Sequence, residues 1–316
     1  MGFFLRLALL CGILLGFLSY FLLFSPPRSF PQEFLLPVKS GETGSDIAET
    51  LRADGAIRSE LVFKVLLRLS GSHSRIIAGT YYFSGPQNAF SIVWRLHVGK
   101  FDLKPLKVTL PEGTNVLQMN TIFKNSLSAF DSETFLRLAK PYEGYLFPDT
   151  YFFYVGQNTA EIVEAMRDNF AAHISASAVQ QVLKASGKSQ ADTVIMASLL
   201  EKEAPDTTNR QIISGILWKR LTLGMPLQVD AVIPYITGKP GDAILQTDYK
   251  IDSPYNTYLY KGLPPGPITN PGLDAIIAAA TPTSTPYLYY LSDKDGTFHY
   301  SKTFNEQLAN QRKYLK

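Results

Sequence analysis

The chain has 316 residues, of which 46% are hydrophobic and 18% are charged, so it is long enough for about two folded units with cores of their own. Its formal net charge is only +3, and it contains no run of Lys or Arg and no basic stripe interleaved with aromatic residues. These properties argue against nucleic acid as a partner. The single cysteine, Cys11, excludes an intrachain disulfide and a cysteine-based zinc site.

The N-terminal region is strongly apolar. Residues 7–24, LALLCGILLGFLSYFLLF, carry no charge, and as a helix they would extend roughly 27 Å, about the thickness of the hydrocarbon core of a bilayer. A cleaved signal peptide is the alternative, but its apolar region is usually only about 7–15 residues long. We therefore predict a cytoplasmic tip and transmembrane anchor in residues 1–24 and a proline-rich linker in residues 25–34. Arg6 favours a cytoplasmic N-terminus, so the chain would cross the inner (cytoplasmic) membrane once and lie mostly outside the cytoplasm.

Residues 35–104 have the pattern of a small βααβ module with a further helix. EFLLPV is typical of a strand, and SDIAETLRADG and SELVFKVLLRLSG have the periodicity of two helices. RIIAGTYYFSG is rich in β-branched and aromatic residues, as strands are. NAFSIVWRLHVGK then predicts a helix that ends at Gly99.

Residues 105–316 predict a larger mixed domain, which makes the fold class α+β. LKVTLPEG is a predicted strand, DSETFLRLA a helix capped by Asp131, and TAEIVEAMRDNFAAHI a longer helix. The aromatic, turn-rich EGYLFPDTYFF lies between these helices. Two more helices, in MASLLEKEAPD and RQIISGILWKRLTLG, precede an irregular stretch to about Pro271 and a hairpin formed by YLYYLSD and GTFHYS.

The helix that contains residues 196–206, MASLLEKEAPD, ends in two carboxylates, Glu201 and Glu203. At about 100° per residue, Glu201 lies in the direction of Ala197 and Ser198, whereas Glu203 lies in the direction of larger apolar residues. Because small residues would leave room for a ligand, the periodicity favours Glu201. Partial burial would raise the pKa of this carboxyl and allow it to donate a proton near neutral pH. An ordinary solvated or paired helix end is the alternative interpretation.

Downstream segments contain the side chains that bind sugars. Carbohydrates are held by flat aromatic faces and by directional hydrogen bonds, and prolines would stiffen a loop that provides them. An ordinary surface connection would also be rich in Gly, Pro and Asn, so that interpretation stays open. The candidate substrate-binding residues in these segments are Gln228, Asp230, Tyr255, Asn256, Tyr258, Pro264 and Pro265.

Other catalytic signatures are missing from the sequence. It has no G-x-S-x-G, S-x-x-K or H-E-x-x-H motif, no phosphate-binding loop and no dinucleotide fingerprint. We therefore expect neither a metal ion nor a cofactor.

Five motifs together resemble one known family, the membrane-anchored endolytic murein transglycosylases of the YceG-like type. Their order and spacing, counted from the N-terminal anchor, run to nearly the last residue, so the resemblance covers almost the whole chain and does not depend on one short pattern. They are EGYLFPDTY (143–151), ASLLEKEA (197–204), GMPLQVD (224–230), SPYNTYLYKGLPPGPITNPG (253–272) and TPYLYYLSDKDGTFHYSKT (285–303).

The resemblance implies that residues 35–104 are a LysM-like module of the kind associated with peptidoglycan binding and that residues 105–316 are the catalytic domain. It makes Glu201 the catalytic acid and adds Glu143, Tyr145 and Asp149 to the substrate-binding residues. In the implied reaction, Glu201 protonates the oxygen between N-acetylmuramic acid (MurNAc) and N-acetylglucosamine (GlcNAc). As a carboxylate it then takes the proton of the muramoyl C6 hydroxyl, which closes a 1,6-anhydro ring without water or a second carboxylate.

The expected partners are nascent peptidoglycan glycan strands, the membrane through the N-terminal helix, and peptidoglycan synthases. Two other functions stay open. A muramidase-type hydrolase would use Asp230 or Asp149 to position water, and its new reducing ends would be heavier by one water. A non-catalytic peptidoglycan-binding scaffold for cell-wall synthases would bind strands without cleaving them.

Overall fold

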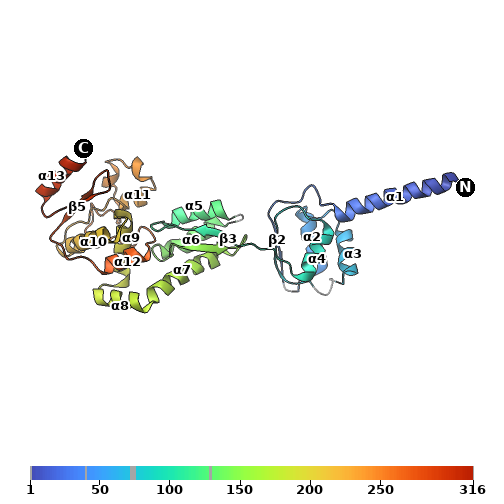
Figure 1. Cartoon of the computed structure of the whole chain (residues 1–316), viewed down its shortest axis with the longest axis horizontal. Coiled ribbons are helices and arrows are strands. Elements are labelled where there is room, and N and C mark those ends of the chain that lie inside the picture. The colour runs from blue at the N-terminus through green and yellow to red at the C-terminus, as the bar shows by residue number, and fades with distance from the viewer. Residues whose placement is uncertain (1, 40, 72–75, 128–129, 316) are drawn as a thin grey trace. The chain divides into compact units, whose positions relative to one another are not determined.

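The computed structural model describes residues 2–39, 41–71, 76–127 and 130–315. Contacts within the chain divide it into two compact units (Figure 1). The first consists of Met1–Leu106, Leu127–Ala129 and Tyr154–Gly156, and the second of Lys107–Ser126, Phe130–Phe153 and Gln157–Lys316. Both units combine helices with small two-stranded sheets, which confirms the predicted α+β class.

The first unit has the βααβ order that the sequence indicates. Its strands β1 (Phe34–Val38) and β2 (Gly79–Phe83) pair antiparallel, and α2 (Gly44–Ala53) and α3 (Glu60–Leu69) lie between them in the chain. The paired residues Leu36 and Tyr81 are only 1% and 0% exposed, so one face of the sheet is core. Helix α4 (Ala89–Val98) follows and ends at Gly99, which adopts the left-handed conformation that favours glycine.

Helix α1 (Gly2–Phe24) contains the predicted anchor segment. A helix that crosses a bilayer needs about 20 consecutive, mostly apolar residues. In the part of the chain that the structure describes, none of the helices combines the length and the apolar character that a membrane crossing requires. The predicted transmembrane helix is therefore not supported.

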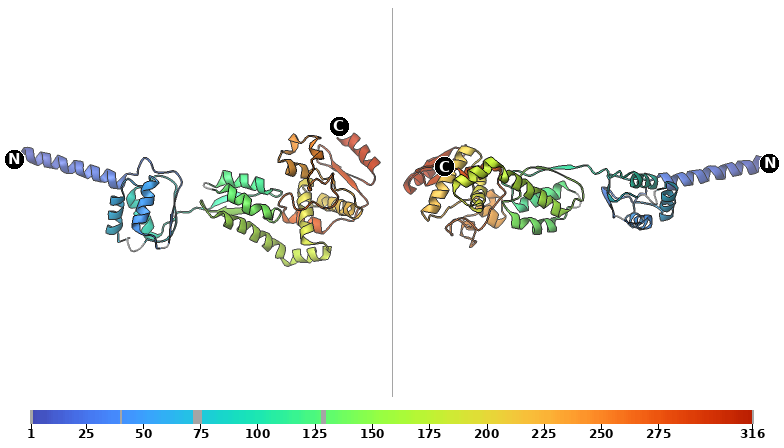
Figure 2. Two further views of the ribbon diagram at one scale, coloured as in Figure 1. Left: turned by 180° about the vertical axis from the view of Figure 1, so that it is seen from behind. Right: turned by 90° about the horizontal axis from the view of Figure 1, so that it is seen from below.

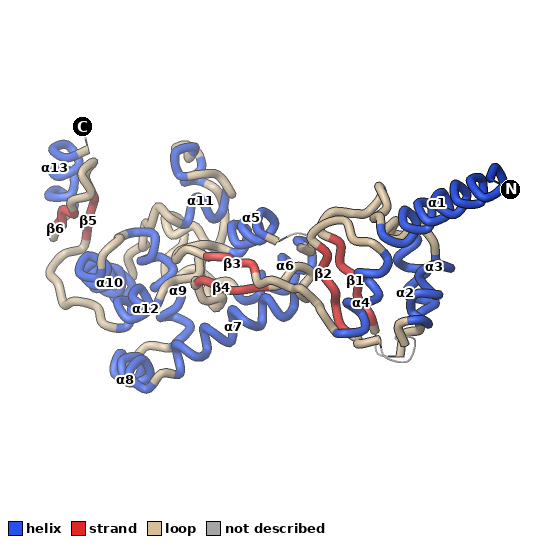
Figure 3. The backbone as a smooth tube through the Cα atoms, turned by 45° about the vertical axis from the view of Figure 1, so that its right-hand side comes forward, coloured by secondary structure: helices blue, strands red, loops and turns tan. Residues whose placement is uncertain are grey.

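The second unit begins with a two-stranded sheet of β3 (Leu106–Thr109) and β4 (Thr150–Phe153) (Figure 3). Asp131 caps α6 as predicted, because its carboxylate accepts the Thr134 N–H at 3.0 Å. The helices of this part are α5 (Val116–Ser126), α6 (Ser132–Ala139), the short 3₁₀ helix η2 (Lys140–Tyr142), α7 (Thr159–Ser175) and α8 (Ser177–Ser186).

The rest of the second unit surrounds α9 (Gln190–Glu203). The predicted hairpin is present as antiparallel strands β5 (Tyr289–Ser292) and β6 (Phe298–Ser301), and an unpredicted helix, α13 (Phe304–Tyr314), follows it. The remaining elements are α10 (Thr207–Thr222), α11 (Val232–Thr237), the 3₁₀ helices η3 (Gly241–Ala243) and η4 (Asp248–Lys250), and α12 (Leu273–Ala280).

Helix α9 is buried on every side. Each residue from Thr193 to Leu200 is buried, and α9 packs against α10 and α12 (Figure 2). Gly215 allows α10 to approach the segment before the hairpin, because a Cβ at this position would lie only 2.0 Å from the Thr283 carbonyl oxygen. The middle of α9 therefore lies deep within the second unit.

Asn270 joins three segments of the second unit from a fully buried position. Its side-chain oxygen accepts the N–H groups of Gly144 and Leu146 at 2.8 and 3.0 Å. Its nitrogen donates to the Thr114 carbonyl at 3.0 Å and to the Glu143 carboxyl at 2.8 Å. The side-chain amide of Asn270 thus connects the loop at residue 114, residues 143–146 and the segment directly before α12.

Replacing Asn270 with Ala should destabilise the protein strongly, because two buried N–H groups and a buried carboxyl lose their partner. We expect the free energy of unfolding to fall by about 3 kcal/mol or more in urea denaturation. Asn305→Ala, at an exposed position of α13, is the matched control and should change it by less than about 0.5 kcal/mol. Equal effects of the two substitutions would contradict the role given to Asn270.

Candidate active site

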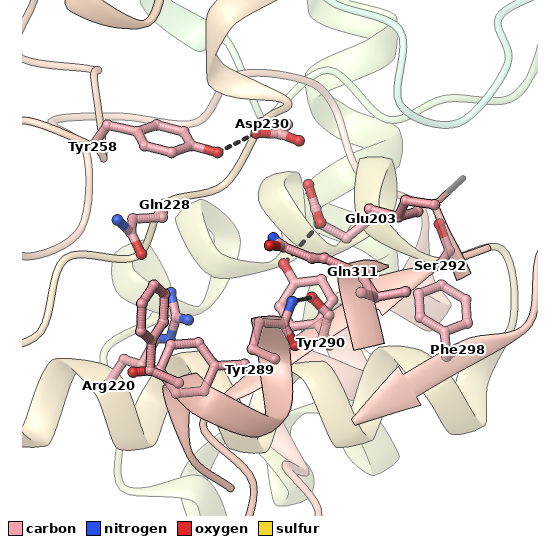
Figure 4. A pocket seen from close by; sticks show the side chains of 14 residues that line it. Glu203, Arg220, Gln228, Asp230, Tyr258, Tyr289, Tyr290, Ser292, Phe298 and Gln311 are labelled. Carbon is pink, nitrogen blue, oxygen red and sulfur yellow. Dashed lines mark hydrogen bonds between the residues drawn. The ribbon is translucent and has the colours of Figure 1, made fainter. Parts of the chain in front are cut away.

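A cavity of about 500 Å³ opens beside the C-terminus of α9 (Figure 4). Its walls come from α9, α10, the segment at residues 228–230, the loop at residue 258, the hairpin and α13. Polar and aromatic side chains dominate its surface, which is suited to a sugar. The residues that line it are Glu203, Arg220, Gln228, Asp230, Tyr258, Tyr289, Tyr290, Leu291, Ser292, Phe298, Phe304, Gln307, Gln311 and Leu315.

Glu203, the last residue of α9, presents its carboxyl to this cavity (Figure 4). The carboxyl accepts the Tyr290 hydroxyl at 2.7 Å, and no cation of the described residues lies within 4.0 Å of it. Burial raises the pKa of Glu203 to about 7, with the charge of Asp230 acting in the same direction and the Tyr290 bond opposing it. Near neutral pH, a large fraction of this carboxyl therefore carries a proton.

Gln228 and Asp230 reach the cavity because the chain alternates between buried and exposed residues here. Leu227 and Val229 are buried, while the two polar residues between and after them are exposed. Gln228 has φ +50°, a conformation that is strained for a residue other than glycine and is typical of functional sites. The Tyr258 hydroxyl donates to the Asp230 carboxylate, which fixes both side chains on the cavity wall.

Glu201 lies in a different environment. Its side chain is only 4% exposed, and it forms a 2.5 Å ion pair with Arg210 and accepts the Gly272 N–H at 2.8 Å. Burial raises the pKa of Glu201, while the Gly272 bond and the Arg210 charge lower it. Glu201 does not line the cavity of Glu203. Its contacts are those of a side chain that connects helices.

Gly272 permits the close packing around Glu201. A Cβ at this position would lie 1.9 Å from an oxygen of Glu112, whose charge also acts on Glu201. Arg210 also contacts Asp274 at 2.7 Å, in the first turn of α12. The ends of α9, α10 and α12 therefore meet at one charged cluster.

The structure brings only part of the predicted binding loop to the cavity. Tyr258 lines it, whereas Asn256 is fully buried and donates to the carbonyls of Tyr249 and Ile251 at 3.0 and 2.9 Å. Tyr255 packs against Tyr235, with ring centroids 5.0 Å apart. Pro264 is buried and Pro265 is exposed, and neither lines the cavity of Glu203.

The three predicted residues of the 143–151 motif are also outside that cavity. The Glu143 carboxyl accepts the Val116 N–H at 3.1 Å at the start of α5, in addition to the Asn270 bond. Tyr145 packs on a buried phenylalanine. Asp149 accepts the Asn169 amide at 3.0 Å. These contacts stabilise the packing of the second unit and do not contribute to the cavity of Glu203.

Several cavity residues did not emerge from the sequence. Arg220, Tyr289 and Tyr290 are separated from Glu203 in the chain, and Gln311 belongs to the unpredicted helix α13. The hairpin motif of the family resemblance contained the two tyrosines and was the available signal for them. Among the described residues, no group of three or more His, Cys, Asp or Glu side chains is placed to hold a metal ion.

Comparison with known proteins identifies the family. A family model described as the YceG-like family matches residues 36–313. The chain belongs to the YceG-like family. A Bacillus subtilis (strain 168) protein named endolytic murein transglycosylase is 32% identical over 305 residues, a match that covers 88% of this chain and 84% of that protein.

Two further relatives extend the comparison within the YceG-like family. A Streptococcus pneumoniae (strain D39) protein with the same name is 28% identical over 326 residues, covering 88% of this chain and 58% of that longer protein. The crystal structure of a YceG-like protein from Listeria monocytogenes superposes with a TM-score of 0.60 at 27% identity. That match covers 88% of this chain and 99% of the Listeria chain.

The carboxyl of Glu143 should make the stability of this YceG-like protein depend on pH. Burial raises the pKa of Glu143 from 4.5 to about 7, against the bonds from Val116 and Asn270. Because the folded state then holds the proton more tightly than the unfolded state, this contribution to stability is complete below about pH 4.5 and is lost as the pH rises to about 7. The loss amounts to at most about 3 kcal/mol.

Urea unfolding measured across this pH range should therefore show a smaller loss of stability in Glu143→Gln than in the wild type. The absolute stability of the variant is not the readout, because the substitution also alters the bond to Val116. Glu133→Gln, at an exposed position of α6, is the control and should keep the wild-type slope. An unchanged slope in Glu143→Gln would contradict the raised pKa.

Proposed function

We propose that this YceG-like protein is a peptidoglycan lytic transglycosylase that cleaves the β-1,4 bond between MurNAc and GlcNAc within glycan strands. The proposal is supported by the names of the relatives, endolytic murein transglycosylase. The observation that carries it is one proton-holding carboxyl, Glu203, at the wall of a polar and aromatic cavity. A cavity of about 500 Å³ is large enough for sugar units of a strand.

In this proposal Glu203, rather than Glu201, is the general acid. A general acid must reach the substrate and must be protonated near the working pH. Glu203 meets both conditions, since it faces the cavity and its pKa is raised to about 7. Glu201, which the sequence pattern favoured, is ion-paired with Arg210 and nearly sealed from solvent. We therefore propose that Glu201 supports the site rather than acting as the acid.

The proposed reaction needs a single cycling proton. Protonated Glu203 donates to the glycosidic oxygen, and the bond from that oxygen to C1 of MurNAc breaks. The Glu203 carboxylate then accepts the proton of the MurNAc C6 hydroxyl as its oxygen bonds to C1. The products are a GlcNAc end and a 1,6-anhydroMurNAc end, no water is consumed, and Glu203 returns to its protonated form.

Substitution of each carboxyl in turn tests this assignment. Glu203→Gln should lower the rate of 1,6-anhydro product formation by about 10³-fold or more, because the amide cannot cycle a proton. Glu201→Gln should lower thermal stability by breaking a buried ion pair but should retain activity in its folded fraction. Activity is measured by chromatography of the new strand ends, and folding by circular dichroism. A folded but inactive Glu201→Gln beside an active Glu203→Gln would overturn the assignment.

The rate should also depend on the protonation of Glu203. Because the protonated carboxyl is the reactive form, kcat/KM should fall by about tenfold per pH unit above the pKa of about 7. Initial rates on purified strands between about pH 5 and pH 9 measure this. A rate that rises with pH through 7 would instead indicate that the ionised carboxylate starts the reaction.

A muramidase-type hydrolysis is the second candidate because Asp230 lies on the same cavity wall and raises the pKa of Glu203. Two carboxyl groups with a water between them would serve inversion. However, Asp230 is engaged by the Tyr258 hydroxyl. Mass spectrometry of the strand ends distinguishes the reactions, since hydrolysis adds one water and ring closure adds none. Strands that are bound but never cut would favour the scaffold function instead.

The proposed substrate lies on the outer side of the cytoplasmic membrane. We therefore propose that both units work there, close to peptidoglycan synthases that supply new strands. This includes a peptidoglycan-binding role for the first unit, which the family resemblance implies to be LysM-like. Inner-membrane location stays a prediction, which cell fractionation can test.

A further inference from the structure

Arg220 of α10 presents an uncompensated charge to the cavity of Glu203. It is 5% exposed, yet it lines that cavity. Its Nε donates to the Leu288 carbonyl at 2.7 Å, and its Nη1 donates to the carbonyls of Leu227 and Pro226 at 2.8 and 3.4 Å. These bonds hold the guanidinium in place and leave Nη2 without a hydrogen-bond partner among the described residues.

The free nitrogen has access to the cavity rather than being sealed in protein. Among the described residues, only Arg58 Nε is a buried side-chain nitrogen or oxygen that lacks a partner. Nη2 of Arg220 also lacks a partner but is not among these buried atoms, so it is accessible to solvent. Figure 4 shows Arg220 beside Tyr289, and the guanidinium carbon lies 4.9 Å from the centroid of that ring.

The described part of the chain contains three buried arginines, and Arg220 differs from the other two. Arg210 is paired with Glu201 at 2.5 Å, and Arg95 lies 3.5 Å from Asp102. No carboxylate of the described residues lies within 4.0 Å of Arg220. Burial lowers the pKa of Arg220, but a guanidinium stays charged at any physiological pH. A buried cation without an anion is costly unless a ligand supplies the counter-charge.

We propose that Nη2 of Arg220 binds a carboxylate of the glycan strand. This inference rests on the proposed function, and it names the chemical group of the substrate that fixes its position. A MurNAc unit carries a lactyl group, whose carboxylate is free in strands without peptides. In peptide-bearing strands, that carboxyl is in amide linkage and the stem peptide brings carboxylates of its own. Arginine is well suited to either, because it donates charge-assisted hydrogen bonds to carboxylates.

The other charged groups of the cavity determine the orientation in which the glycan strand binds. Asp230 would repel a carboxylate, and Glu203 would do so in its ionised form, whereas Arg220 attracts one. In Figure 4, Arg220 lies toward Tyr289 and away from Asp230. The strand therefore binds with a carboxylate at Arg220 and its scissile oxygen at the protonated Glu203.

Binding measurements with the full chain carrying Glu203→Gln test this inference, because that variant should not cut the strand. The probes are purified naked glycan oligomers, the same oligomers with every lactyl carboxylate converted to a neutral methylamide, and peptide-bearing oligomers. By isothermal titration, we expect neutralisation to weaken binding about tenfold. Peptide-bearing oligomers that bind as tightly as the naked ones identify a stem carboxylate as a second ligand. If they bind as weakly as the methylamide, the lactyl carboxylate is the one recognised.

A second arm removes the cation. Arg220→Gln, combined with Glu203→Gln, should bind charged and neutral oligomers equally. Lys219→Gln is the matched control because Lys219 is also on α10 and donates to the nearby carbonyls of Thr285 and Pro286, but does not line the cavity. This control should keep the tenfold difference. The comparison of ligands needs no Arg220 variant, so it decides whether a carboxylate is recognised even when that variant does not fold.

Equal affinity for charged and neutral oligomers in the Glu203→Gln protein would overturn the carboxylate site and leave the proposed function intact. Failure to bind any of the oligomers would overturn both. A tenfold difference that persists in Arg220→Gln would show that another group of the chain recognises the carboxylate.

Discussion

The ion pair between Glu201 and Arg210 holds the second unit together at the site. Both side chains are less than a tenth exposed, and their charged atoms are 2.5 Å apart. Arg210 also donates to the Ala204 carbonyl and to Asp274, while Glu201 accepts the Gly272 N–H at the start of α12. Three helix ends are thus joined through one buried ion pair, with Asp274 more exposed at its edge. Loss of one partner would leave the other buried and uncompensated, at a cost of about 3–5 kcal/mol.

This cluster gives two carboxyls that are two residues apart different surroundings. Burial raises the pKa of Glu201, and the Gly272 N–H and the Arg210 charge, which favour the ionised form, offset this only in part. Glu203, two residues later, receives hydrogen bonds from the Tyr290 hydroxyl and the Ala231 backbone but no cation of the described residues, and burial raises its pKa to about 7. Environment, and not residue type, decides which carboxyl anchors and which holds a proton. The anchored residue fixes the position from which the other faces the cavity.

The sequence predicted those features that depend on local residues. The caps at Asp131 and Gly99 and the C-terminal hairpin depend on nearest neighbours, and all are present. The choice between Glu201 and Glu203 could not be made in that way. Helical periodicity distinguishes faces only when one face is polar, and α9 is buried on every side from Thr193 to Leu200. The direction of each carboxyl is set by α10, α12 and the hairpin, which are distant in the chain.

The roles of residues in the aromatic loop of residues 253–272 are also set by contacts that composition does not show. Sequence composition indicated a set of sugar-binding groups, but Asn256 uses its amide to hold the loop from within, and its oxygen accepts the Tyr258 N–H at 3.0 Å. That bond helps to place the Tyr258 hydroxyl on Asp230.

The negative charge that Tyr258 holds in place acts on the proposed acid. Asp230 raises the pKa of Glu203, and so keeps the proton available at the cavity wall. Arg220, in contrast, has no carboxylate of the described residues within 4.0 Å. A carboxylate-bearing sugar strand would compensate the cation while presenting its glycosidic oxygen to the proton, so recognition and chemistry would use opposite charges of one cavity.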